Sequence, residues 1–217
     1  MSDSPLTIGI DFGGTSVKIA VVFQSHIIDH APPIATQEFS SPEELIAAMV
    51  RVVEDLRAKH PGIAAIGVGM PGFVDFDAGL VYNLTNVAGW TAVPLRKILH
   101  QVTGLPVIVE NDANCMGFAE WKCGAGRGFQ HVVFISMGTG VGGAIIANGQ
   151  MIRGARHGAG EIGQTSIDYQ GRPGHYGNLG ALEDYVGNRE ITATAHDAYR
   201  AAGIEKAFEE CTPAALA

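Results

Sequence analysis

The chain has 217 residues, a formal net charge of −8, and 47% hydrophobic but only 17% charged positions. Such a chain can bury one large core or two modest ones, and its composition excludes a disordered protein. The acidic balance and the lack of any lysine and arginine cluster argue against nucleic acid or an anionic membrane as a partner. We therefore expect a globular protein that acts on small molecules.

The cysteines and the first residues indicate a cytoplasmic protein. Cys115, Cys123 and Cys211 are odd in number and lack Cys-x-x-Cys spacing, so we expect reduced thiols that act as packing residues. Residues 1–5 are polar and lack the basic and apolar regions of a secretory signal. No apolar run approaches the roughly twenty residues of a membrane helix. Neither secretion nor membrane spanning is expected.

The first predicted elements are two short strands joined by a glycine turn. In this turn Gly13 and Gly14 let backbone N–H groups approach a phosphate closely, while Thr15 adds a hydroxyl and Lys18 adds a point charge. The same residues also suit an ordinary hairpin turn. On these residues alone, an anion site and a plain hairpin both remain open.

Helix signals follow in the chain. Ser41 is predicted to cap a helix that starts at Pro42 and runs to Lys59, and Glu44 to complete a capping box. A second helix is predicted over residues 94–102. This alternation predicts an α/β sheet whose strands pair first antiparallel and then through helical crossovers, with ligands at the carboxyl ends. The predicted strands of this half cover residues 6–11, 17–23, 27–29, 63–70 and 106–110.

A second unit is predicted after Asp112, which gives two α/β domains over residues 1–112 and 113–217. It begins with a helix over residues 113–121 and continues into a strand. That strand meets Gly138-Thr139-Gly140 and a further apolar segment, which repeats the arrangement of the first turn. Two such units predict two related sheets that face a shared cleft and hold one phosphate chain from both sides.

Six segments in a fixed order carry a resemblance to a known family. They are Asp11-Phe12-Gly13-Gly14-Thr15, Gly67 to Asp75, Asn86-Val87-Ala88-Gly89-Trp90, Glu110-Asn111-Asp112-Ala113-Asn114, Gly138-Thr139-Gly140 and His157-Gly158-Ala159-Gly160-Glu161-Ile162-Gly163. The chain resembles the ROK family (repressor, open reading frame, kinase) over nearly its whole length. Six motifs in order are far more specific than any one of them.

The resemblance implies a two-domain actin-like ATPase or ribonuclease-H-like fold, with mixed sheets flanked by helices, and an ATP-dependent, hexokinase-type phosphotransferase that uses Mg²⁺. It implies that Asp112 is the general base that accepts the proton of the attacking sugar hydroxyl. Local sequence offers the alternative that Asp112 caps the following helix; both roles can coexist, because a capping site would keep the carboxylate ionised.

Asp11 is expected to be an outer-shell partner of Mg²⁺. The residues assigned to the nucleotide are Asp11, Gly13, Gly14, Thr15, Lys18, Gly138, Thr139 and Gly140.

The implied substrate is a hexose, with glucose phosphorylated at its 6-hydroxyl as the first choice. Kinases for N-acetylmannosamine, fructose and allose share the same motifs. Amides and carboxylates suit neutral polyols because they offer donors and acceptors without demanding charge. For Asn86 and Asn111 the alternative to sugar binding is that the side chain hydrogen-bonds to nearby backbone. The residues assigned to the sugar are Asn86, Asn111, Glu161, Gln164 and Glu183.

A homodimer is implied by the resemblance alone.

The chain departs from the family at its zinc site. Many members bind a structural zinc through one histidine and three cysteines. Here Gln164 stands for the histidine, and Gly174, Tyr176 and Ala181 stand for the cysteines. Zinc needs roughly four N or S ligands, which His175 alone cannot supply. We predict that this chain holds no structural metal.

The second departure is at the C-terminus. Family members continue past the equivalent of Ala217, whereas Thr212-Pro213 begins a helix that ends after one turn. We expect a truncated chain that exposes apolar surface. Two alternatives to a kinase therefore stay open: a catalytically weak or inactive sugar-binding fragment, and a sugar-responsive transcription regulator. The regulator is the less expected, because Asp11 leaves no room for a preceding helix-turn-helix.

Overall fold

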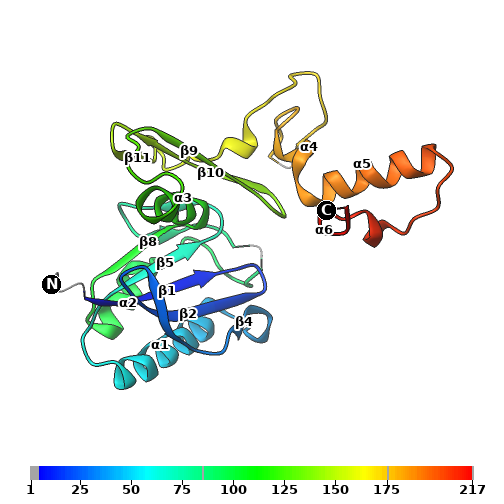
Figure 1. Cartoon of the computed structure of the whole chain (residues 1–217). Coiled ribbons are helices and arrows are strands. Elements are labelled where there is room, and N and C mark those ends of the chain that lie inside the picture. The colour runs from blue at the N-terminus through cyan, green and yellow to red at the C-terminus, as the bar shows by residue number, and fades with distance from the viewer. Residues whose placement is uncertain (1–4, 85, 175, 217) are drawn as a thin grey trace. The chain divides into compact units, whose positions relative to one another are not determined.

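The computed structural model describes residues 5–84, 86–174 and 176–216. The chain forms two compact units (Figure 1). The first comprises Met1–Ala119 and Gly154–His157, and the second comprises Glu120–Arg153 and Gly158–Ala217. The units divide inside helix α3 (Asp112–Cys123). The predicted domain boundary at residue 112 stays a prediction.

A mixed sheet forms the centre of the first unit, with strand order β3-β2-β1-β5-β8 and the short β4 paired to β2. The pairs β1/β2 and β2/β3 are antiparallel, whereas β1/β5 and β5/β8 are parallel. This is the predicted change from hairpin to crossover pairing. The strands are β1 (Leu6–Phe12), β2 (Ser16–Phe23), β3 (His26–His30), β4 (Ile34–Ala35), β5 (Ile63–Met70) and β8 (Val107–Asn111).

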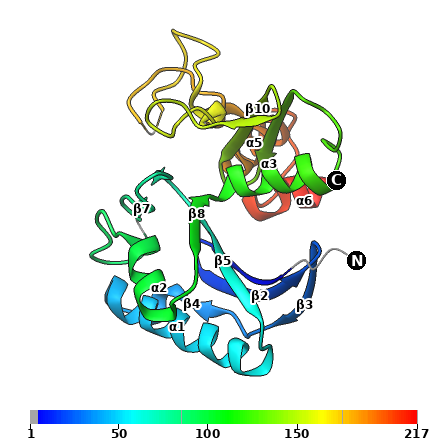
Figure 2. The same cartoon turned by 90° about the vertical axis from the view of Figure 1, so that its left-hand side faces the viewer.

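Two helices make the crossovers and cover one face of this sheet. Helix α1 (Pro42–Lys59) connects to β5, and α2 (Leu95–Thr103) leads into β8. Figure 2 shows the two helices side by side on that face, where buried Met49 and Leu99 join the core. The unit also holds the 3-10 helix η1 (Thr36–Glu38) and a small hairpin of β6 (Val74–Asp75) and β7 (Leu80–Val81).

The start of α1 confirms one half of the predicted capping box and corrects the other. The Ser41 hydroxyl accepts the Glu44 N–H at 3.3 Å, as predicted. The Glu44 carboxylate, however, accepts the hydroxyl and the N–H of Ser40, at 2.8 and 3.1 Å, one residue before the cap. The hydroxyl bond from Ser40, followed by the backbone bond, keeps the pKa of Glu44 below its ordinary value.

The second unit contains an antiparallel sheet in the order β11-β10-β9. Its strand β9 leaves Val133, Ile135 and Met137 exposed on alternate positions. The elements are β9 (Val132–Met137), β10 (Val141–Ala147), β11 (Gln150–Ile152), η2 (Ile162–Gln164), α4 (Glu183–Val186), α5 (Asn188–Ala201), η3 (Phe208–Cys211) and α6 (Pro213–Leu216).

The cysteines only partly match the expectation of packing residues. Cys211 is fully buried and Cys115 half-buried, but Cys123 is exposed at the end of α3, so the packing interpretation is wrong for Cys123. None of the helices in the described ranges has the length and apolar character that crossing a bilayer requires.

Candidate active site

The first glycine turn lies at the carboxyl end of β1, between β1 and β2. Phe12, the residue before it, is fully buried and packs edge-on against Trp90, with ring centroids 5.4 Å apart. The turn is closed by the Gly13 N–H, which donates to the Ser16 carbonyl at 2.9 Å. A Cβ on Gly14 would have no neighbour within 4 Å, so there is open space beside the turn. A phosphate has room to approach this backbone closely.

The carbonyls of this turn are satisfied from other parts of the first unit. The Gly14 carbonyl accepts the side-chain amide of Asn86 at 2.8 Å and the hydroxyl of Thr36 at 3.2 Å. The Thr15 carbonyl accepts the Thr36 N–H at 3.0 Å. The predicted sugar residue Asn86 is therefore bonded to the predicted phosphate turn.

Asp11 of the first motif forms an ion pair with Lys18, which lies three residues after that motif. Lys18 Nζ lies 3.2 Å from Asp11 Oδ2, and both side chains are more than half exposed. Such a surface pair contributes little to stability. Breaking the contact costs little free energy. Lys18 therefore remains able to bind a nucleotide phosphate and Asp11 to bind the water shell of its cation, as predicted.

Asp112 follows the carboxyl end of β8, at the same sheet edge as the first turn. In the register of the parallel strands, Asp11 is opposite Gly69, and Gly69 is opposite Glu110. Ligand sites in such sheets lie beyond the carboxyl ends of the strands. The structure thus brings the predicted general base and the predicted phosphate turn to one edge of one sheet.

The cap of α3 is Asn111, and the capping alternative for Asp112 is wrong. Asn111 Oδ1 accepts the N–H of Asn114 at 3.0 Å, which is the bond of an N-cap residue to the third residue of its helix. Asp112 is already the first residue of α3, and its Oδ1 accepts the N–H of the adjacent Ala113 at 2.8 Å.

Burial raises the pKa of the Asp112 carboxyl above its ordinary value, the Ala113 N–H opposes this, and the charge of Asp11 adds to it. Of these influences only the Ala113 N–H favours the charged form, so the surroundings of Asp112 do not lower its pKa as the capping interpretation expects. A raised pKa brings a carboxylate closer to the range in which a general base works at neutral pH.

Glu110 is a residue that sequence reasoning left without a role. It is only 7% exposed, and its Oε1 accepts both the Asn111 N–H at 2.9 Å and the Asn114 side-chain amide at 3.1 Å. These bonds fix the strand-to-helix junction on which Asp112 lies. The sequence signal was its place in the Glu-Asn-Asp-Ala-Asn segment, whose two asparagines are its hydrogen-bond partners in the structure.

The two asparagines assigned to the sugar both donate to backbone carbonyls. Asn86 donates to Gly14, as described, and the Asn111 side-chain amide donates to the Gly72 carbonyl at 3.1 Å. This is the backbone-bonding alternative that the sequence left open. It does not exclude contacts with a sugar through the remaining lone pairs and N–H groups.

The second glycine turn joins β9 and β10, as predicted, with Met137 paired to Val141. The Gly138 N–H donates to the Gly140 carbonyl at 2.9 Å. A Cβ on Gly138 would have no neighbour within 4 Å. Thr139 lies between Gly138 and Gly140. The second unit therefore repeats the strand-turn-strand arrangement of the first, again with a glycine that has open space beside it. Its turn is tighter, because the closing bond joins residues two apart instead of three.

Glu183 lies against this second turn. Its Oε2 accepts the Val141 N–H at 2.8 Å, and a Cβ on Gly140 would collide with the same carboxylate. The nearby signature segment also packs on β10, because a Cβ on Gly163 would collide with the Val141 carbonyl. Glycine is thus required at Gly163, where the neighbour is backbone, whereas a side chain on Gly140 would displace the Glu183 carboxylate.

The remaining sugar candidates are both half-buried: Glu161 directly precedes the short η2 helix, and Gln164 is its last residue. The Gln164 N–H donates to the Glu161 carbonyl at 3.1 Å, and the Asn178 side chain donates to the Gln164 carbonyl at 2.9 Å. Together with Glu183 they belong to the second unit, whereas Asn86, Asn111 and Asp112 belong to the first.

A model of the ROK family matches residues 7–216. The chain belongs to the ROK family. It is 36% identical over 181 residues to a glucokinase of Halalkalibacterium halodurans, which covers 81% of this chain and 54% of that protein. It is 34% identical over 153 residues to a xylose repressor of Caldicellulosiruptor bescii, which covers 69% of this chain and 38% of that protein.

Solved structures agree with this assignment. A ROK glucokinase from Streptomyces griseus, in complex with glucose and AMPPNP, superposes with a TM-score of 0.74 at 33% identity and covers 91% of this chain and 62% of that one. The predicted actin-like fold is thereby confirmed for this ROK chain. The chain spans little more than half the length of the curated glucokinases it matches.

The zinc-site prediction concerns residues of the second unit. Across the described parts of this ROK chain, no three His, Cys, Asp or Glu side chains come together as metal ligands. His175 lies outside the described residues. The absence of a structural zinc stays a prediction, which metal analysis of the purified protein tests directly.

The signature segment of this ROK chain also contains a contact between a histidine and two carboxylates that the sequence did not predict. His157 adopts a φ of 58°, and its Nε2 lies 3.2 Å from Asp75 Oδ1 and 3.8 Å from Asp77 Oδ2. Asp75 ends one motif and His157 begins another, so only tertiary packing reveals the contact. It attaches the segment Gly154–His157 to the first unit.

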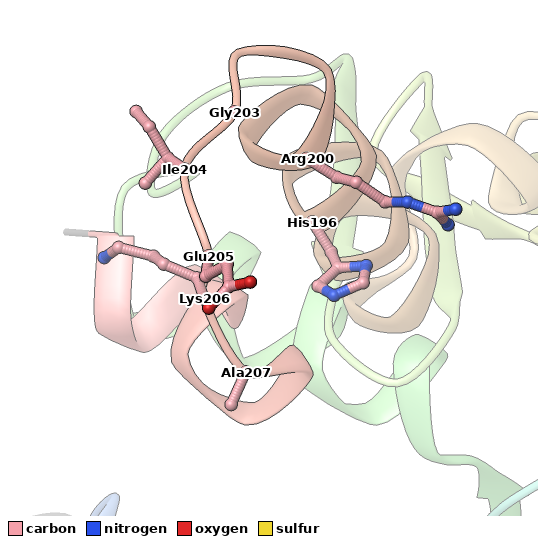
Figure 3. Close-up of a pocket in the computed structure, with 7 residues that line it drawn as sticks. All are labelled: His196, Arg200, Gly203, Ile204, Glu205, Lys206 and Ala207. Atoms are coloured by element: carbon pink, nitrogen blue, oxygen red, sulfur yellow. The ribbon is translucent and has the colours of Figure 1, made fainter.

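A hollow of about 610 Å³ opens beside α5 and contains none of the predicted site residues (Figure 3). Its two cations do not converge on one point: Figure 3 shows Arg200 and Lys206 pointing in opposite directions, and Lys206 lies over the ring of Tyr199. The hollow is lined by His196, Arg200, Gly203, Ile204, Glu205, Lys206 and Ala207.

Proposed function

We propose that this chain is the catalytic part of an ATP-dependent sugar kinase that phosphorylates a hexose, with glucose as first candidate, at its 6-hydroxyl. One observation carries the proposal: a partly buried carboxylate, Asp112, lies at the same sheet edge as a glycine turn that is open to a phosphate. The similarity to glucokinases supports the same activity.

In this proposal Asp112 accepts the proton of the attacking hydroxyl as the new P–O bond forms. The burial that raises the pKa of Asp112 makes it a better proton acceptor than an ordinary exposed carboxylate. Glu110 and Asn111 fix the junction and so orient Asp112. Orientation of the reacting groups is a large part of phosphoryl-transfer catalysis.

The glycine turns are proposed to bind the nucleotide phosphates through backbone N–H groups, and Lys18 to add a charge. The open space at Gly14 and Gly138 fits this role, since a phosphate oxygen needs close approach to the backbone. The exposed carboxylate of Asp11 suits the water shell of Mg²⁺, which neutralises phosphate charge when bound. Asn86, Asn111, Glu161, Gln164 and Glu183 are proposed to bind the sugar.

A second candidate function is sugar binding without transfer, as in a sugar-responsive regulator. The similarity to a xylose repressor favours this candidate. We further propose a homodimer in the cytoplasm, for which light scattering and cell fractionation are the respective tests.

The test of the proposed function is a coupled assay of ADP release with ATP, Mg²⁺ and a hexose panel. The panel contains glucose, N-acetylmannosamine, fructose and allose, and the matched control is Asp112→Asn. Sugar-dependent ADP release by the unchanged chain but not by the variant supports a kinase and names its sugar. Sugar binding by calorimetry without ADP release would favour the second candidate.

A further inference from the structure

Thr36 is a buried residue that contacts the first phosphate turn from a distant part of the chain. It is 1% exposed and is the first residue of η1, directly after β4, which pairs with β2 at Ser16 and Val17. It makes two bonds to the turn: its hydroxyl to the Gly14 carbonyl at 3.2 Å and its N–H to the Thr15 carbonyl at 3.0 Å. No motif that carries the family resemblance includes Thr36.

These bonds decide which polar groups the turn has left for a ligand. The Gly14 carbonyl is taken by Thr36 and by Asn86, and the Thr15 carbonyl by Thr36. Within residues 5–84, 86–174 and 176–216, the N–H groups of Gly14 and Thr15 donate no hydrogen bond. Phosphate oxygens are acceptors, so they are attracted by such N–H groups and repelled by carbonyl oxygens.

We propose that Thr36 is a positioning residue for nucleotide binding: it fixes the carbonyls of the turn away from the ligand, so that the N–H groups of Gly14 and Thr15 face the phosphates. This inference rests on the proposed function. A β-branched side chain suits the role because its χ1 angle is restricted, which keeps the hydroxyl directed at Gly14 with little entropy to lose. Full burial removes water as a competing partner.

The decisive variant is Thr36→Val, which keeps the shape of the side chain and removes the hydroxyl. Thr36→Ser keeps the hydroxyl and is the conservative rescue. Thr103→Val is the matched control, because Thr103 is also buried in the first unit and its hydroxyl donates to the Leu99 carbonyl at 2.7 Å, with no bond to the turn. Thr36→Ala serves as a second variant should Thr36→Val not fold.

The measurements are ATP affinity by calorimetry without sugar, the KM and kcat of the coupled assay, and Tm. We expect Thr36→Val to weaken ATP binding roughly three- to tenfold, the value of one hydrogen bond, and to raise the KM for ATP with little change in kcat. Thr36→Ser should bind ATP within about twofold of the unchanged chain. Thr103→Val should lower Tm and leave ATP affinity unchanged.

Equal ATP affinity of the unchanged chain and of Thr36→Val or Thr36→Ala would overturn the inference and leave the proposed function standing. An equal loss of ATP affinity in Thr103→Val would also overturn it, because the effect would then be general destabilisation. Absence of ATP binding by the unchanged chain would overturn the proposed function and this inference with it.

Discussion

The Oδ1 atom of Asn111 lies 3.0 Å from the backbone nitrogen of Asn114, and this contact caps α3. The neighbouring Asp112 is the first residue of the helix and is therefore not its cap. Its carboxylate bonds to the adjacent Ala113 N–H, and burial raises its pKa. The carboxylate therefore satisfies one N–H of the first helical turn, while burial disfavours its charged form.

The first prediction concerns that carboxylate. Replacing Asp112 by Asn should lower kcat by about 10²–10⁴ and leave hexose affinity nearly unchanged, because the amide keeps the shape but cannot accept the proton. Steady-state kinetics and calorimetry measure the two quantities. Unchanged turnover would remove Asp112 from the mechanism.

The second prediction is a pH effect. Asp112 works as a base only when ionised, so its raised pKa moves the acidic limb of the kcat/KM profile to higher pH. Burial is the largest cause, but the charge of Asp11 contributes, and Asp11→Asn removes that contribution. The limb should therefore move to lower pH in Asp11→Asn. Asp77→Asn, which alters an exposed carboxylate of the same unit, should leave the limb in place.

The third prediction separates two roles of Asn86. Its side-chain amide donates to the Gly14 carbonyl at 2.8 Å, so Asn86→Ala should weaken ATP binding in the absence of sugar, by roughly three- to tenfold. Calorimetry with ATP alone measures this. If Asn86 contacts only the sugar, ATP affinity will not change. Asn83→Ala, at an exposed asparagine of the same segment, is the control.

The fourth prediction concerns Glu183, whose Oε2 accepts the Val141 N–H at 2.8 Å. Glu183→Ala should lower the free energy of unfolding by about 1.5–3 kcal/mol, because a hydrogen bond to a charged acceptor is lost. Glu183→Gln retains an acceptor oxygen and should lose less. A loss of sugar affinity in both variants would support the sugar-binding role. Loss of stability without loss of sugar affinity would assign Glu183 to the turn alone.

The fifth prediction concerns the start of α1. Ser41→Ala should lower the free energy of unfolding by about 0.5–2 kcal/mol, and Ser41→Gly by only a few tenths, because the Ser41 hydroxyl accepts the Glu44 N–H. Urea titrations of the two variants measure the difference. Equal stability of Ser41→Ala and the unchanged chain would mean that Pro42 and packing alone define the helix start.

Local pattern was sufficient for much of the first unit. The helix Pro42–Lys59, the strand Ile63–Met70 and both glycine turns follow from periodicity and from capping and turn residues, and the structure has them. Such signals depend on neighbours a few residues apart, which the sequence itself supplies. The order of the motifs likewise sufficed to indicate the family.

What the sequence could not supply is the partner of each polar side chain. Asn86 and Gly14 are 72 residues apart, and Thr36 and Gly14 are 22 apart; these bonds exist only because the sheet and its crossovers bring the segments together. Even at close range, Asn111 and Asp112 were equally good caps by composition. The end of β8 decided between them, because it directs Asn111 onto the first turn of α3 and leaves Asp112 beside Asp11. The sequence determined the elements and the family, and packing across the sheet decided which polar groups are occupied and which face a ligand.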